Sequence, residues 1–313
     1  MARNRWFRAV RVSFSILALG YIAWALRHYW HAYETQPLEP HLRWAMVLAS
    51  GAVFIATYGV LVQTWRIMLV EWEARLSFWR AAHIWSIANL YRYVPGKVWQ
   101  IGAMGMMAQR EGVSPVAATG TAVLNTVVNV TTGFAVALAT GSVALDAYHP
   151  GASRVALVLT VLALGGLLVL PAAMPRVLAV ARRISGRDLP ATALPPRVIA
   201  YAIVGNLITW VMYGFAFQLL VIGVLGSAAG ALPSYIAVYS ASYVLGYIVL
   251  FLPAGIGARD GAMAAALPAF KLMTGPQAVL IAVASRLWTS ILELVPGFLF
   301  LAVDAWRRPS KSG

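Results

Sequence analysis

The stretch RYVPGKVWQ, residues 92–100, interrupts a long apolar region with a Pro-Gly pair and with two cations, Arg92 and Lys97. Proline lacks a backbone donor and disfavours helix in the residue before it, and glycine tolerates the dihedral angles of a turn. The apolar arms on either side, within residues 81–109, are about 14 and 13 residues long, whereas a membrane-spanning helix needs about 20. The stretch therefore predicts two short helices joined by a non-helical break.

The composition of the whole chain places this break in a membrane protein. Of the 313 residues, 61% are hydrophobic and 11% are charged, whereas soluble domains average about 25% charged residues. The predicted class is an all-α integral membrane protein. Cysteine is absent, which excludes disulfides, thiolate metal sites and cysteine nucleophiles. The net charge of +14 comes from cations at the ends of apolar segments, which indicates topology signals and contact with anionic lipid rather than nucleic-acid binding.

About six apolar segments are long enough to cross a membrane. They are Val12–Trp30, Trp44–Val62, Val116–Leu138, Val155–Pro171, Val198–Val224 and Ala278–Val303. A second interrupted region, Tyr235–Met273, is broken by residues 253–257 and then by Arg259 and Asp260, so it also predicts two helices around a break. The first segment resembles a signal peptide with a small-residue cleavage site at 23–25, but its longer apolar run favours an uncleaved span.

The distribution of Lys and Arg predicts the orientation. Arginines precede the first predicted span, follow the second, separate the fourth from the fifth and follow the sixth, whereas residues 140–152 and 225–234 contain no Lys or Arg. Both termini are therefore expected in the cytoplasm. With six spans, each interrupted region is interpreted as a re-entrant hairpin, the first inserted from the cytoplasm and the second from the opposite side. Two ordinary membrane crossings in each region would leave both termini on the same side as well, so this arrangement stays open as an alternative.

The two breaks also resemble each other. The sequences YVPGKVWQIGAM (93–104) and FLPAGIGARDGAM (251–263) share an aromatic residue, an apolar residue, proline, small residues and a closing Gly-Ala-Met. Similar breaks with opposite orientations predict an inverted repeat, with halves at about 40–140 and 197–304 of a single polytopic domain covering 1–313. The residues that form the breaks are Pro95, Gly96, Pro253, Gly255 and Gly257.

The breaks are the predicted binding site. Helices that start near Lys97 and Asp260 direct free N–H groups and positive dipole ends toward the break. Together with Arg92 and Arg259, this arrangement suits an anion such as a phosphate. The alternative for Arg92 and Lys97 is that they are interfacial anchors whose side chains reach the cytoplasmic surface.

The last predicted span adds two ionisable residues. Arg286 and Glu293 are seven residues apart and share one helix face. Arg286 lies about nine residues into the span, roughly 13 Å deep, and an ionisable residue at that depth indicates function. The alternative is an internal ion pair of Arg286 with Asp260 or Glu293 that only holds helices together. The predicted substrate-binding residues are Arg92, Lys97, Arg259, Asp260, Arg286 and Glu293.

Uncharged polar residues recur at helical spacing in other segments. Such stripes are more typical of helix–helix contacts than of substrate sites, although the tyrosines could line a groove for a lipid headgroup. The three stripes are Thr121, Asn125, Asn129 and Thr132; Asn206, Thr209 and Tyr213; and Tyr235, Tyr239, Tyr243 and Tyr247. The five histidines are scattered, and no phosphate-binding loop, HExxH motif or nucleophile–base arrangement is present. We therefore expect neither enzymatic activity nor a metal or cofactor.

Three motifs resemble the membrane region of the lysylphosphatidylglycerol synthase/flippase family of bacteria and archaea. They are LYRYVPGKVWQIGAM (90–104), LPAGIGARDGAM (252–263) and ASRLWTSILELVPG (284–297). The resemblance implies transport of lipids with polar headgroups, either aminoacylated phosphatidylglycerol or polyprenyl-phosphate-linked sugars. It implies that the break residues are functional, together with Lys97, Arg259, Asp260 and Arg286. The chain departs from the family at Trp99 and Gln100, where Gly-Glu is common, and at Asp260, where Glu is usual. An aminoacyl-transferring soluble domain is missing, so synthesis of aminoacyl lipid is not expected.

The sequence thus predicts a flippase for an anionic-headgroup lipid, phospho- or polyprenyl-phosphate-linked, in the bacterial or archaeal cytoplasmic (inner) membrane. One alternative is a small-solute or ion transporter that uses the same site. Another is a non-transporting membrane partner of a lipid-modifying glycosyltransferase.

Overall fold

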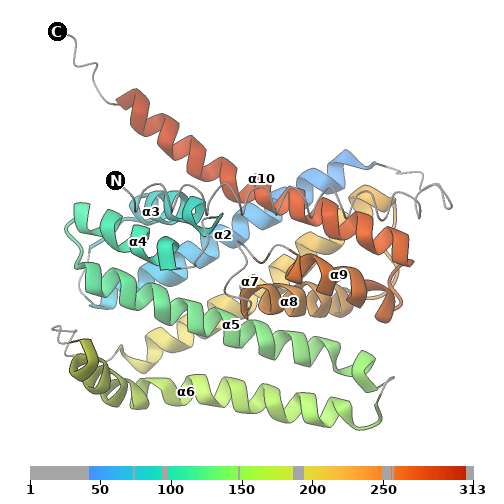
Figure 1. Cartoon of the computed structure of the whole chain (residues 1–313), viewed down its shortest axis with the longest axis horizontal. Coiled ribbons are helices and arrows are strands. Elements are labelled where there is room, and N and C mark those ends of the chain that lie inside the picture. Colours follow the sequence, from blue (N-terminus) through green and yellow to red (C-terminus); the bar gives the residue numbers. More distant parts are fainter. Residues whose placement is uncertain are drawn as a thin grey trace, which may run out of the picture.

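The computed structural model describes residues 42–72, 75–93, 98–146, 149–185, 194–248, 255 and 257–307. All regular structure in these ranges is helical, with nine α-helices and one short 3₁₀ helix (Figure 1). The first predicted span, Val12–Trp30, lies outside the described residues. So do four of the residues singled out at the breaks: Pro95, Gly96, Lys97 and Pro253.

In the part of the chain that the structure describes, five helices are long and apolar enough to cross a membrane, and each contains one of the predicted spans. They are α2 (Trp44–Trp72), α5 (Pro115–Asp146), α6 (Ala152–Ser185), α7 (Pro196–Leu225) and α10 (Gly275–Arg307). The fourth span was predicted to end at Pro171, but α6 continues to Ser185. A proline removes only one hydrogen bond from a helix, and transmembrane helices tolerate that loss.

Four shorter helices and the 3₁₀ turn form the two interrupted regions. They are α3 (Phe78–Leu90), η1 (Tyr91–Tyr93), α4 (Val98–Arg110), α8 (Leu232–Ile248) and α9 (Ala258–Ala269). The helices after the breaks therefore begin next to Lys97 and Asp260, as the sequence predicts. At the start of α3 the Ser77 hydroxyl accepts a hydrogen bond from the Arg80 amide at 3.4 Å, a standard N-terminal cap.

Glycine is required at the second break for two separate reasons. Gly255 and Gly257 have φ angles of +69° and +86°, which side-chain-bearing residues rarely adopt. In addition, a Cβ atom on Gly255 would lie 2.7 Å from the carbonyl oxygen of Gly246 in α8. The break therefore passes so close to the α8 backbone that no side chain fits between them.

The long helices pack through small residues and buried polar contacts. Helices α2 and α7 lie side by side, and the Ser50 hydroxyl donates to the Ala216 carbonyl at 2.7 Å. Between α5 and α7, Asn129 Nδ2 donates to Asn206 Oδ1 at 2.7 Å, and Asn206 Nδ2 donates to Asn125 Oδ1 at 3.4 Å. The prediction that these asparagine stripes join helices is thus confirmed.

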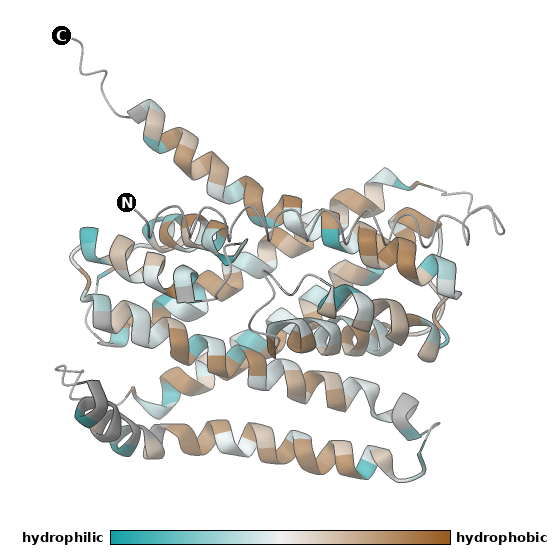
Figure 2. Ribbon diagram, viewed as in Figure 1, coloured by the Kyte–Doolittle hydropathy of each residue, from teal (hydrophilic) through white to brown (hydrophobic). Residues whose placement is uncertain are grey.

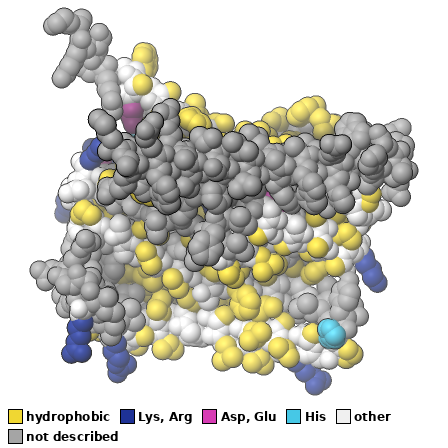
Figure 3. Space-filling model, viewed as in Figure 1, with side chains coloured by type: hydrophobic (Ala, Val, Ile, Leu, Met, Phe, Trp, Pro, Cys, Tyr) yellow, Lys and Arg dark blue, Asp and Glu magenta, His cyan; other side chains and the backbone are white. Residues whose placement is uncertain are grey.

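The outer surface of the bundle is apolar. Helix α6 lies against α5 at the edge of the molecule, and much of its surface is hydrophobic (Figure 2). Val155, Leu157, Leu162 and Leu168 are each at least 59% exposed there. On the described part of one face, hydrophobic side chains cover the middle, and Lys and Arg lie toward its left and right edges (Figure 3). In a multi-pass membrane protein, apolar side chains contact lipid tails and cations lie at the interfaces, and this surface has both features.

Candidate functional site

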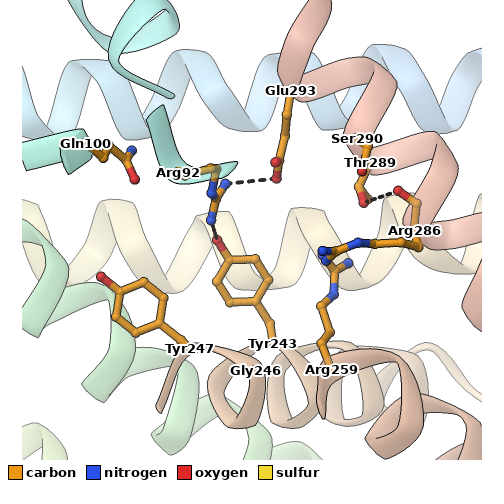
Figure 4. A pocket seen from close by; sticks show the side chains of 10 residues that line it. All are labelled: Arg92, Gln100, Tyr243, Gly246, Tyr247, Arg259, Arg286, Thr289, Ser290 and Glu293. Atoms are coloured by element: carbon orange, nitrogen blue, oxygen red, sulfur yellow. Dashed lines mark hydrogen bonds and ion pairs between the residues drawn. The ribbon is translucent and has the colours of Figure 1, made fainter. Parts of the chain in front are cut away.

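A cavity lies where the two interrupted regions meet α10 (Figure 4). The space outside the protein atoms, including the open solvent at its mouth, is about 480 Å³. Its lining carries a formal charge of +2, from three arginines and one glutamate. The lining residues are Arg92, Gln100, Tyr243, Gly246, Tyr247, Arg259, Arg286, Thr289, Ser290 and Glu293. The first turns of α4 and α9 contribute Gln100 and Arg259, so both helices that follow a break begin at this cavity.

Arg92 connects the first break to both α8 and α10. Its Nη1 donates to Glu293 Oε1 at 2.9 Å, and its Nη2 donates to the Tyr243 hydroxyl at 2.6 Å. The other carboxylate oxygen, Glu293 Oε2, accepts a hydrogen bond from the Tyr93 hydroxyl at 2.8 Å. The side chains of Arg92 and Glu293 are only 15% and 7% exposed. Arg92 therefore belongs to a buried polar network, which differs from the geometry of an interfacial anchor.

Arg259 is the most buried cation of the site. The residue is 5% exposed, and its guanidinium carbon lies 5.0 Å from the centre of the Tyr239 ring and 5.3 Å from that of Tyr243. These ring contacts offset part of the cost of removing the charge from water. Its Nη2 atom is buried and has no hydrogen-bond partner among the described residues. Because a guanidinium has five N–H donors, Arg259 retains capacity to bind an acceptor.

The close approach of α8 and α9 positions Arg259 against the tyrosines. A Cβ atom on Gly246 would lie 2.7 Å from the Arg259 Cβ, so a larger residue in α8 would push α9 away. Tyr239 and Tyr243 in turn stack on Tyr213 of α7, with ring centres 5.5 and 6.4 Å apart. The tyrosine ladder therefore packs α8 against α7, and two of its members, Tyr243 and Tyr247, also form part of the cavity wall.

Arg286 of α10 lies opposite Arg259. Figure 4 shows their guanidinium groups directed toward one another inside the cavity. Thr289, one turn further along α10, donates to the Arg286 carbonyl at 3.2 Å, so its hydroxyl is already engaged by its own helix. Two neighbouring cations in a partly desolvated space repel one another, and an anion between them would relieve that repulsion.

Asp260 caps the helix that carries Arg259. Its Oδ2 accepts a hydrogen bond from the backbone N–H of Gly257 at 3.1 Å, so it caps the first turn of α9. Asp260 is not among the residues that line the cavity. Of the six predicted binding residues, four line the cavity, Asp260 lies beside it as a cap, and Lys97 is outside the described residues.

A second chamber adjoins the first, and its space outside the protein atoms, including the open solvent at its mouth, is about 660 Å³. The two share Arg92, Gln100, Tyr243 and Tyr247. Gln100 Nε2 donates to Asn89 Oδ1 at 3.1 Å, and Asn89 Nδ2 donates to the Tyr58 hydroxyl at 3.3 Å. The sequence analysis did not include these residues in the site. The signals in the sequence were Gln100, which stands where Glu is common in the family, and the polar stripes, of which Asn125, Asn129, Tyr213, Tyr243 and Tyr247 line this chamber.

The fold and the cavity together define a multi-pass α-helical membrane protein with a buried cationic site at two helix breaks. The sequence model of the family described as the lysylphosphatidylglycerol synthase TM region matches residues 8–297. The chain therefore belongs to this family. Membership indicates a membrane protein of the lipid-metabolism or flippase kind. No curated protein matches the chain with significant similarity.

Proposed function

We propose that the protein is a transporter that moves a lipid with an anionic headgroup between the two leaflets of a cytoplasmic membrane, with both termini in the cytoplasm. The observation that carries this proposal is the cavity in which three arginines face a single glutamate. The family supports the lipid as substrate. The catalytic arrangements sought in the sequence are lacking, which favours transport over enzymatic activity.

An anion is the ligand that this cavity would bind best. Burying an ionised side chain costs several kcal/mol unless an opposite charge or hydrogen-bond acceptors compensate it. Glu293 is bonded to Arg92 and Tyr93, whereas Arg259 has a buried donor with no protein acceptor among the described residues. A phosphate offers several acceptor oxygens in the geometry that a guanidinium binds bidentately.

The helix breaks provide the means of transport in this proposal. Helices α3 and α4 have 13 residues each, about 20 Å, and are too short to cross the hydrocarbon core separately. We assign the α3–α4 and α8–α9 pairs as two re-entrant hairpins of opposite orientation, related as an inverted repeat. Movement of one repeat against the other would expose the arginines to each leaflet in turn, while the lipid tails stay in the bilayer.

The proposal is tested by lipid binding and transport of the purified protein. Native mass spectrometry with equal amounts of phosphatidylglycerol and phosphatidylcholine measures binding. Vesicles that contain fluorescent phosphatidylglycerol measure transport, because dithionite quenches only the outer leaflet. We expect Arg259→Gln and Lys97→Ala to reduce phosphatidylglycerol binding about tenfold or more, as expected for a lost charge-assisted hydrogen bond.

The matched control is Arg197→Gln. The Arg197 side chain is 70% exposed and pairs with Glu71 at the surface, so its replacement should leave binding and transport unchanged. Wild-type transport rates in a well-folded Arg259→Gln protein would overturn the site. Equal retention of both lipids by the wild type would overturn the proposal and favour a small-solute transporter or a non-transporting partner of a glycosyltransferase.

A further inference from the structure

The second chamber differs from the first in the chemistry of its walls. Among the described residues of its lining, Arg92 is the only charged one, and none is Asp or Glu. Ten of the other fourteen lining residues carry aromatic, amide or hydroxyl side chains. The polar and aromatic members of the lining are Tyr58, Trp85, Asn89, Gln100, Asn125, Thr126, Asn129, Tyr213, Tyr243 and Tyr247.

These walls offer hydrogen bonds to a neutral ligand. Asn89 is 3% exposed and lies in the chain of hydrogen bonds from Gln100 to Tyr58. The indole Nε1 of Trp85 is buried and has no hydrogen-bond partner among the described residues. A buried N–H donor without a partner costs free energy, and a ligand oxygen that accepts from it removes that cost. Amides both donate and accept, which matches hydroxyl groups.

The position of Arg92 makes the two chambers parts of one site. Its guanidinium belongs to the wall of both, beside Tyr243 and Tyr247. A headgroup with its phosphate at Arg259 and Arg286 would therefore extend past Arg92 into the second chamber. The group attached to that phosphate would meet aromatic rings and amide groups.

We propose that the second chamber binds a neutral polyhydroxyl ring, a hexose or a cyclitol, linked to the phosphate of the transported lipid. This inference rests on the proposed function and specifies its substrate class. Ring faces of Tyr and Trp contact the C–H groups of such a ring, and the amides bond its hydroxyl groups. A cationic aminoacyl headgroup fits poorly, because the described part of this chamber's lining offers it neutral amides and hydroxyl groups and no carboxylate.

The test compares headgroups on identical acyl chains. The full-length protein is titrated with dioleoyl phosphatidic acid, phosphatidylinositol, lysylphosphatidylglycerol and phosphatidylcholine, and binding is measured by native mass spectrometry. We expect phosphatidylinositol to bind about tenfold tighter than phosphatidic acid, which corresponds to one or two buried hydrogen bonds. Lysylphosphatidylglycerol should bind more weakly than phosphatidylinositol.

Two variants locate this preference in the second chamber. Trp85→Phe keeps an aromatic ring but loses the buried N–H, and Asn89→Leu keeps the volume but loses the amide. Each should reduce the ratio of phosphatidylinositol binding to phosphatidic acid binding severalfold, and thermal unfolding in detergent shows that each variant is folded. Trp79→Phe, at a 74% exposed position of the same helix, is the matched control and should behave as wild type.

The outcomes separate this inference from the proposed function. Equal binding of phosphatidylinositol and phosphatidic acid, both above phosphatidylcholine, would overturn the polyhydroxyl ligand and leave the anionic-lipid transporter intact. Tighter binding of lysylphosphatidylglycerol than of phosphatidylinositol would also overturn the neutral polyhydroxyl ligand and leave the anionic-lipid transporter intact. No preference over phosphatidylcholine would overturn both. Competition by free inositol 1-phosphate at the same concentration as the lipid would support the ligand chemistry but overturn the lipid as its source.

Discussion

Arg92 in η1 and Glu293 in α10 form a buried ion pair at 2.9 Å, although they are 201 residues apart in the sequence. The same arginine donates to Tyr243 of α8. One side chain therefore connects the first break, the helix before the second break and the last helix. Any movement of the two interrupted regions relative to α10 must stretch or exchange these bonds.

Removal of the negative partner should destabilise the protein strongly. Glu293→Gln leaves Arg92 as a buried charge with only neutral partners, and loss of one partner of a buried pair costs about 3–5 kcal/mol. Arg92→Gln should have a similar effect, and the double variant should lose less than the sum of the two single variants. Thermal unfolding in detergent measures all three. The exposed pair of Arg197 and Glu71 is the control. Its double-mutant cycle should give a coupling free energy of about 0–1 kcal/mol.

The Tyr243 hydroxyl is expected to position Arg92 without holding Arg259. Tyr243→Phe removes the acceptor 2.6 Å from Arg92 Nη2 but keeps the ring beneath Arg259. The expected loss of unfolding free energy is about 1–3 kcal/mol, the cost of a buried donor without its partner. Tyr201→Phe, at a 62% exposed position, is the control. If both variants melt like wild type, the bond from Arg92 to Tyr243 contributes nothing to the fold.

The second break should not tolerate a side chain at Gly255. Gly255→Ala places a Cβ atom 2.7 Å from the Gly246 carbonyl oxygen at a φ of +69°, so we expect a loss of at least about 1–2 kcal/mol and weaker lipid binding. Gly261→Ala, three residues into α9, meets nothing within 4 Å and should stabilise the helix by up to about 1 kcal/mol. Equal melting temperatures for the two alanine variants would contradict the geometry of the break.

A pH dependence is predicted at the turn between α5 and α6. Hydrogen bonds from the hydroxyl and from the backbone N–H of Ser153 lower the pKa of Asp146. The distance from the Ser153 backbone nitrogen to Asp146 Oδ1 is 2.8 Å. Because the folded-state pKa lies below the unfolded value of about 3.9, this contribution to stability is present above that pH. It is lost as the pH falls through the folded-state pKa.

The measurement is the melting temperature between about pH 3 and 6 for the wild type and for Asp146→Asn. The wild type should lose more stability on acidification than the variant, because only the wild type has to protonate this carboxylate. Parallel curves for the two proteins would show that the hydrogen bonds from Ser153 do not hold the carboxylate in its charged form.

Local chemistry decided much of the architecture. The five spans α2, α5, α6, α7 and α10 follow from apolar length, which each segment carries by itself. The starts of α4 and α9 follow from the Pro and Gly residues before them, because those residues restrict their own backbone wherever they stand. Arg259 and Arg286 were recognisable as site residues because charges are costly within apolar segments.

The partners of these charges depended on the tertiary structure. Glu293 pairs with Arg92, which comes from a distant part of the chain, and Asp260 caps α9 and does not line the cavity. The contribution of Trp85 and Asn89 to the second chamber was not predicted. A helix shows its own polar faces in its sequence, but which faces meet depends on how the helices cross. The sequence alone therefore determined a membrane protein with two broken helical regions and buried cations, and only packing between distant helices decided which groups those cations face.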